Sequence, residues 1–103
     1  MIRAEFYEKQ GLLTGFEFSG HSGFAEVGKD VACAAVSSAV QLTVSILDSL
    51  GFEPDVEVGD NVIRCTVKKS GKASGAVLEQ LRLHFKSILE EFPNTINITI
   101  SEV

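Results

Sequence analysis

The chain has 103 residues, the length of a single domain, and residues 1–103 are expected to fold as one unit. Hydrophobic residues make up 45% and charged residues 22%, a balance typical of globular proteins and not of disordered ones. The net charge of −5 disfavours direct nucleic-acid binding, because domains of that class usually present a basic face.

The sequence shows neither the pattern of a secretory signal nor that of a membrane span. The N-terminal residues show neither a basic head followed by an apolar stretch nor a signal cleavage site. The longest apolar segment, residues 31–50, is interrupted by serines, Gln41 and Asp48, which argues against a membrane span. The sequence therefore predicts a cytoplasmic protein that binds no membrane and keeps Cys33 and Cys65 reduced.

Residues 2–19 predict a β-hairpin, because apolar side chains alternate on both sides of a turn at Lys9-Gln10-Gly11. The next segment, residues 20–29, contains Gly20, Gly23 and Gly28 and has no sustained periodicity. This composition predicts a loop, and its glycines would let it act as a mobile lid.

The remaining elements follow from the apolar spacing. A helix is expected over residues 31–50, with Asp30 as its N-cap and Gly51 at its end, and its largely apolar first half predicts deep packing. Strands are expected near 52–58, 61–68 and 96–100, and a second helix ends at Pro93. The order ββαββαβ, with a third strand short or absent, predicts an α+β fold in which two helices pack on an antiparallel sheet.

Cys33 is the first candidate functional residue. With Asp30 as N-cap, Cys33 falls in the first helical turn, where backbone N–H groups lack intrahelical acceptors and the helix dipole is positive. Such a position lowers the pKa of a thiol and supplies donors for an oxyanion. The carboxylate of Asp30 opposes this effect in part, because it is a nearby negative charge.

His21 precedes this cysteine at the end of the predicted hairpin, and a glycine-rich loop can bring its imidazole to the thiol. A cysteine with a neighbouring histidine is the minimum nucleophile and base for acyl transfer. Ser37 lies one helical turn after Cys33 and can orient a partner or the substrate. Cys65 has the apolar parity of its strand and is interpreted as core, while His84 is interpreted as a boundary residue of the second helix.

Three other interpretations of the same residues stay open at this point. Cys33 can be a packed core residue in a non-catalytic binding or assembly module, since buried cysteines usually behave as small hydrophobes. It can also be a redox-responsive thiol, although such a thiol usually needs a resolving partner. A metal site is disfavoured, because these residues lack the closely paired ligands of a structural zinc site. No metal or other cofactor is expected.

The stretch "GHSGFAEVGKDVACAAVSSA" resembles the signature of the ribosomal-processing cysteine protease (Prp) family. That family shows Gly-His, a glycine-bearing loop, and then Gly-x-Asp-x-x-Cys-Ala-x-Val-Ser. These residues stand here as Gly20-His21 and as the run from Gly28 through Asp30 and Cys33 to Ser37. The specific motif covers residues 20–37, and the chain length and the ββα opening also agree.

The resemblance implies a cytoplasmic, homodimeric cysteine endopeptidase with His21 as general base and Cys33 as nucleophile. Asp30 and Ser37 match motif positions and would support the site. The implied substrate is the N-terminal extension of a basic ribosomal protein, large-subunit protein L-twenty-seven, cut after a Phe-Phe pair and before a small residue. The glycine-rich loop with Gly20, Gly23 and Gly28 would order over the substrate. An acidic enzyme suits a basic substrate.

Overall fold

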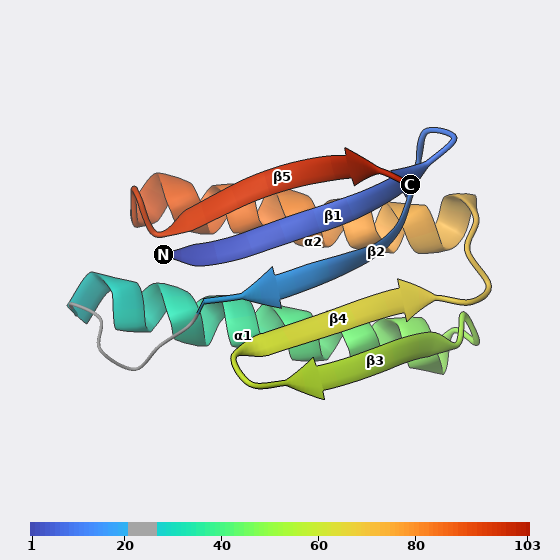
Figure 1. Ribbon diagram of the computed structural model, residues 1–103, viewed down its shortest axis with the longest axis horizontal. Helices are drawn as coiled ribbons and strands as arrows, with labels where there is room; N and C mark the ends of the chain where they lie inside the picture. The colour runs from blue at the N-terminus through green and yellow to red at the C-terminus, as the bar shows by residue number, and fades with distance from the viewer. Residues whose placement is uncertain (21–26) are drawn as a thin grey trace.

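The computed structural model describes the backbone of residues 1–20 and 27–103 and the side chains of residues 1–20 and 31–103. Within these ranges five strands and two helices follow the predicted order ββαββαβ (Figure 1). The third strand is present and has six residues. The elements are β1 (Ile2–Lys9), β2 (Leu12–Ser19), α1 (Val27–Ser49), β3 (Pro54–Gly59), β4 (Val62–Val67), α2 (Lys72–Glu91) and β5 (Ile96–Glu102).

The strands form one sheet in the order β3-β4-β2-β1-β5. The pairs β1/β2, β2/β4 and β3/β4 are antiparallel, as predicted, but β1 and β5 run parallel, so the sheet is mixed. The parallel pairing arises from α2, which crosses the sheet between β4 and β5. Because the chain returns along this helix, β5 runs in the same direction as β4. β1 has that same direction, because both β1 and β4 are antiparallel to β2.

Both helices cover the same face of the sheet (Figure 1). Alternate residues of the strands point toward them, as the predicted parity requires, and Phe6, Phe16 and Phe18 are almost fully buried. Phe85 of α2 packs on these rings, with its ring centroid 5.8 Å from that of Phe6. The core therefore lies between the sheet and the helices, with Cys65 of β4 and Ile96 of β5 also part of it.

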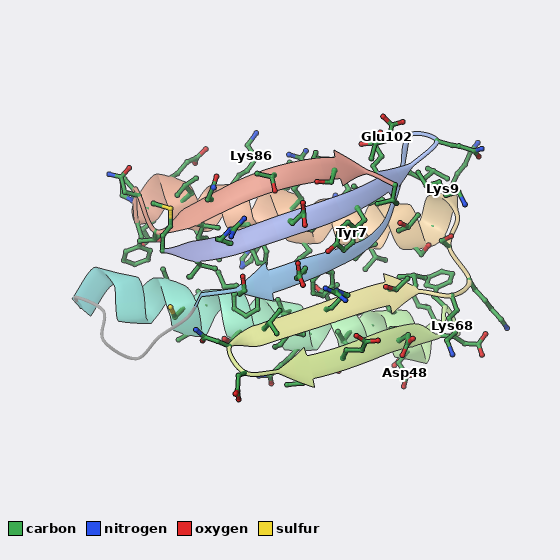
Figure 2. All side chains as sticks on the ribbon, viewed as in Figure 1. Tyr7, Lys9, Asp48, Lys68, Lys86 and Glu102 are labelled. Carbon is green, nitrogen blue, oxygen red and sulfur yellow. The ribbon has the colours of Figure 1, made fainter. Side chains whose placement is uncertain are left out.

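The opposite face of the sheet carries a polar network. The Tyr7 hydroxyl donates to a Glu17 carboxylate oxygen at 3.3 Å, and Arg64 Nη2 donates to the other oxygen at 2.7 Å. Burial, together with the carboxylates of Glu17 and Glu5, raises the pKa of Tyr7. Figure 2 shows Tyr7 toward the C-terminal end of β1, in the half of the sheet where Lys9 and Glu102 are labelled. Polar contacts thus run across this face, and neither of the two described helices covers it.

The start of α1 differs from the sequence prediction. The helix begins at Val27, so Asp30 is its fourth residue and not its N-cap. Gly28 does not stop the helix, because one glycine costs only about 1 kcal/mol relative to alanine, and tertiary packing of a long apolar face outweighs that. The predicted end is confirmed: Gly51 has a φ of +81°, and the Phe52 N–H donates to the Leu47 carbonyl at 3.0 Å.

The packing of α1 also differs. One stripe of the helix is buried on the sheet, including Ala32, Val36 and Val40, but Val31 is 46% exposed. The prediction of deep packing is therefore wrong for one side of the helix, because no segment within residues 1–20 and 27–103 covers the side that faces away from the sheet. Composition alone would let Val31–Ser49 cross a membrane, with a mean hydropathy of 1.6. In this fold the apolar stripe is explained by its contact with the sheet.

Candidate active site

Cys33 lies on α1, six residues after the helix begins. Its side chain is partly buried and packs against the edge of the hydrophobic core. Helical spacing places Cys33 on one stripe with Ser37, Val40 and Val44, because residues three or four apart share a face. Ser37, also partly buried, is thus one turn beyond the cysteine, as predicted.

The later position of Cys33 in the helix changes the predicted electrostatics. The backbone N–H groups without intrahelical acceptors are the first four, which in α1 belong to residues 27–30. Cys33 lies about 9 Å beyond Val27 along the axis, at 1.5 Å per residue, whereas the dipole acts mainly within the first turn. The prediction that Cys33 occupies the first turn is therefore wrong, and α1 gives its sulfur less dipole stabilisation than expected.

The chain enters the predicted loop from a fixed point. The Gly20 N–H donates to the Asn61 carbonyl at 3.2 Å, which ties the end of β2 to the turn between β3 and β4. Gly20 has a φ of +88°, and a Cβ there would lie 2.6 Å from the Met1 carbonyl oxygen, so only glycine fits. His21 follows directly, but His21 and Gly23 lie outside the described residues, as does the side chain of Asp30, and only the backbone of Gly28 is described.

Cys65 and His84, the other cysteine and the other histidine, do not belong to the candidate site. Cys65 is fully buried on the helix side of β4, and burial, with a smaller effect of Asp55, raises the pKa of its thiol to about 11. It is a core residue, as predicted. His84 is exposed on α2 and lines the space between the two helices, which confirms its predicted boundary position.

That space is an apolar groove of about 480 Å³ between α1 and α2. Its α1 side is the stripe Ala35, Ala39, Leu42 and Ile46, which lies on the flank of the helix away from the stripe of Cys33. No sequence prediction pointed to this groove. Its signal was the apolar character of α1 nearly all round, which in a fold of only two layers leaves one apolar flank uncovered.

The motif that contains His21, Cys33 and their neighbours also has a counterpart in known proteins. The family model of cysteine protease Prp matches residues 1–97. The chain belongs to the Prp family. The predicted resemblance is thereby confirmed, and the match includes every residue named above as a candidate for the site.

Individual Prp relatives agree with this assignment. The ribosomal processing cysteine protease Prp of Bacillus subtilis is 42% identical over 53 residues, a stretch that covers 50% of this chain and 46% of that protein. The aligned part thus spans just under half of the relative's length.

Solved structures show that the Prp fold extends over the whole chain. The Streptococcus mutans protein SMU.848 has a TM-score of 0.82 at 26% identity, covering 100% of this chain and 96% of that one. The Prp of Staphylococcus aureus in complex with a substrate peptide has a TM-score of 0.87 at 21% identity, covering 98% and 100%. The mixed sheet with two helices on one face is therefore the fold of these proteins.

Proposed function

We propose that this protein is a cysteine endopeptidase in which Cys33 is the nucleophile and His21 the general base. The observation that carries the proposal is the Prp family match over residues 1–97, which includes both residues. The placement of Cys33 is compatible with this role, because its side chain is only partly buried and the chain leaves β2 toward His21 at a fixed point, Gly20.

In the proposed reaction His21 accepts the thiol proton of Cys33, and the sulfur attacks the carbonyl carbon of the scissile peptide bond. The tetrahedral intermediate collapses when His21 gives that proton to the leaving amine, and a thioester remains on Cys33. A water molecule, deprotonated by His21, then attacks the thioester carbonyl. The new carboxylate leaves, and the proton returns to the sulfur.

Because α1 gives Cys33 little dipole stabilisation, His21 must supply most of the activation of the thiol. Asp30 precedes Cys33 by three residues on the helix, and Ser37 follows it by four. We assign both the role of positioning residues for the histidine and cysteine. The segment with Gly20, Gly23 and Gly28 is proposed to close over the bound peptide.

The proposed substrate is the N-terminal extension of ribosomal protein L-twenty-seven, cut between a Phe-Phe pair and a small residue. Its basic character suits a chain with a net charge of −5. We further propose that the enzyme acts as a homodimer in the cytoplasm. The uncovered apolar flank of α1, with Leu42 62% exposed, is the feature that supports self-association.

The test is cleavage of a synthetic peptide that contains an apolar stretch followed by Phe-Phe-Ala-Ser. Wild type, Cys33→Ala and His21→Ala are incubated with it under reducing conditions, and the products are weighed by mass spectrometry. Cleavage between Phe and Ala by wild type alone is the expected result. If folded, reduced wild type leaves the peptide intact, this substrate assignment is wrong. If Cys33→Ala still cleaves the peptide, Cys33 is not the nucleophile.

The same variants separate an enzyme from a binding module. A catalytic Cys33 reacts with iodoacetamide at mildly acidic pH, and His21→Ala slows that reaction. A cysteine that is merely packed resists the reagent until the protein unfolds. Sedimentation of wild type and Leu42→Glu tests the homodimer: the proposal expects a dimer that the charge converts to a monomer.

A further inference from the structure

One edge of β3 is free to pair with another strand. β3 is the outermost strand of the sheet, paired on one side with β4 and on the other with no strand among the described residues. The Glu53 carbonyl accepts the Lys68 N–H at 3.1 Å, so this carbonyl points toward β4. From there the backbone direction alternates, and the N–H and C=O groups of Val56 and Val58 point away from the sheet. Pro54, which lacks an N–H, falls on the same outward series.

The side chains of Val56 and Val58 lie on the core-facing side of the sheet but are not fully covered. Val56 is opposite Cys65 and Val58 opposite Ile63, so both belong to the face of the sheet that the helices cover. Nevertheless Val56 is 38% exposed and Val58 is 75% exposed. The helix-side face is therefore apolar at this edge, and the described part of the structure covers Val56 only in part and leaves most of Val58 open.

This edge lies on the flank of α1 that carries Cys33. α1 contacts β3, whereas α2 contacts β2 and β5. The α1 stripe with Ala39 and Leu42 turns toward α2, so the opposite stripe, with Cys33 and Ser37, turns toward the β3 side. β3 ends at the turn to which Gly20 is bonded, and the N-terminal part of α1 lies at that end of the sheet (Figure 1).

The charge of the edge indicates what can pair with it. Residues 53–60 contain Glu53, Asp55, Glu57 and Asp60 and no lysine or arginine. Two of these carboxylates have a cation of a neighbouring segment beside them, Lys69 at 3.2 Å from Glu53 and Arg64 at 3.8 Å from Glu57, but both pairs are largely exposed and the edge keeps an excess of negative charge. A second copy of β3 would bring the same carboxylates against them, which is unfavourable. A basic segment in extended conformation would instead bring positive charges against these carboxylates, which is favourable. Its backbone would bond to Val56 and Val58, and its alternate apolar side chains would cover their exposed side chains.

We propose that β3 is the docking strand for the peptide substrate, which adds to the sheet edge as a sixth strand and runs past Gly59 toward Cys33. The proposal rests on the proposed protease function and names how that site takes its substrate. It requires an extended, basic peptide with apolar residues at every second position.

Backbone methylation of the peptide is the direct test. A synthetic peptide in which lysines alternate with apolar residues ahead of Phe-Phe-Ala-Ser is made in a series, each member N-methylated at one residue. Binding to Cys33→Ala is measured by calorimetry, and cleavage is measured with wild type. Strand addition predicts that methylation weakens binding at least ten-fold at every second residue and less than two-fold at those between. An effect without this two-residue period overturns the proposal.

A matched pair of protein variants tests the edge itself. Val58→Lys adds a cation to the exposed helix-side face of β3, and Ile100→Lys does the same on β5, the other edge, where Ile100 is 48% exposed. We expect Val58→Lys to raise KM at least ten-fold and Ile100→Lys less than two-fold. Equal thermal midpoints and equal rates of Cys33 alkylation control for folding. If Val58→Lys does not fold, the methylation series decides.

The outcomes also separate this inference from the protease assignment. Binding with the two-residue period but without cleavage retains the docking strand and refutes the protease. Cleavage without the period retains the protease and refutes the docking strand. If the peptide neither binds nor is cleaved, the substrate assignment is wrong and the docking strand with it. A Val58→Lys variant that changes only the oligomeric state would assign the edge to a second copy and overturn the proposal.

Discussion

Raising the pH tests how strongly the fold excludes the Cys65 thiolate. Burial raises the pKa of this thiol from 9.0 to about 11, so the folded protein holds its proton over a range in which the unfolded chain releases it. The contribution to the free energy of unfolding is therefore intact below pH 9 and is lost as the pH rises from 9 toward 11. Between pH 8 and pH 10.5 the loss amounts to about 2 kcal/mol, at about 1.36 kcal/mol for each unit of pKa difference.

The assay is urea denaturation at pH 8 and at pH 10.5 of two proteins that both carry Cys33→Ala, one of which also carries Cys65→Ala. The raised pKa of Tyr7 has an effect of the same sign, but it is common to both proteins and cancels in the comparison. The protein that keeps Cys65 should lose about 2 kcal/mol more than its partner. A difference in stability between the two that is the same at both pH values would refute the reasoning.

Three further substitutions have expected outcomes, each measured as a change in urea midpoint. Gly15→Ala places a Cβ 2.4 Å from the Cys65 carbonyl oxygen, so β2 and β4 must separate, and we expect a loss of about 1–3 kcal/mol; an unchanged midpoint would contradict that contact. Phe85→Ala removes a ring that is 1% exposed and should cost about 3–5 kcal/mol, with a smaller loss indicating a core that collapses into the space. Arg64→Ala removes a half-exposed ion pair with Glu17 and should change stability by less than about 1 kcal/mol; a larger loss would mean that the polar face is stabilising.

Much of the fold was predictable because local patterns determine it. The hairpin follows from alternation around Gln10 and Gly11, which take φ values of +53° and +81°, the left-handed pair that a two-residue turn needs. The buried stripe of α2, which includes Leu78, Leu81 and Phe85, follows from helical spacing in the same way. Each of these features depends on residues close together in sequence.

The incorrect predictions concern relations that local patterns do not contain. The alternation in β5 shows a strand, but not that it pairs in parallel with β1, which is decided by the path of α2 across the sheet. Asp30 resembles an N-cap in sequence, and its place inside α1 depends on the packing of residues far beyond it. No prediction was made for the burial of Val58, whose 75% exposure follows from its place at the sheet edge.

The candidate site was predictable in its residue types but not in its geometry. The motif singles out Cys33, and the structure places it on α1 with a partly buried side chain. The helical turn in which it lies was mispredicted, since three glycines before it resemble a continuous loop. The tie between Gly20 and Asn61 had no sequence signal, because it is a backbone hydrogen bond between distant segments.

The parallel pairing of β1 and β5 has a practical consequence for attaching tags and supports. The chain enters β1 beside Gly20, where the Met1 carbonyl nearly touches the glycine, and it leaves β5 at the far end of the sheet (Figure 1). A fusion partner joined ahead of Met1 therefore emerges next to the entry of the segment that bears His21. One joined after Val103 is held away from it by the length of a strand, about 23 Å for seven residues. Immobilisation for binding measurements belongs at Val103.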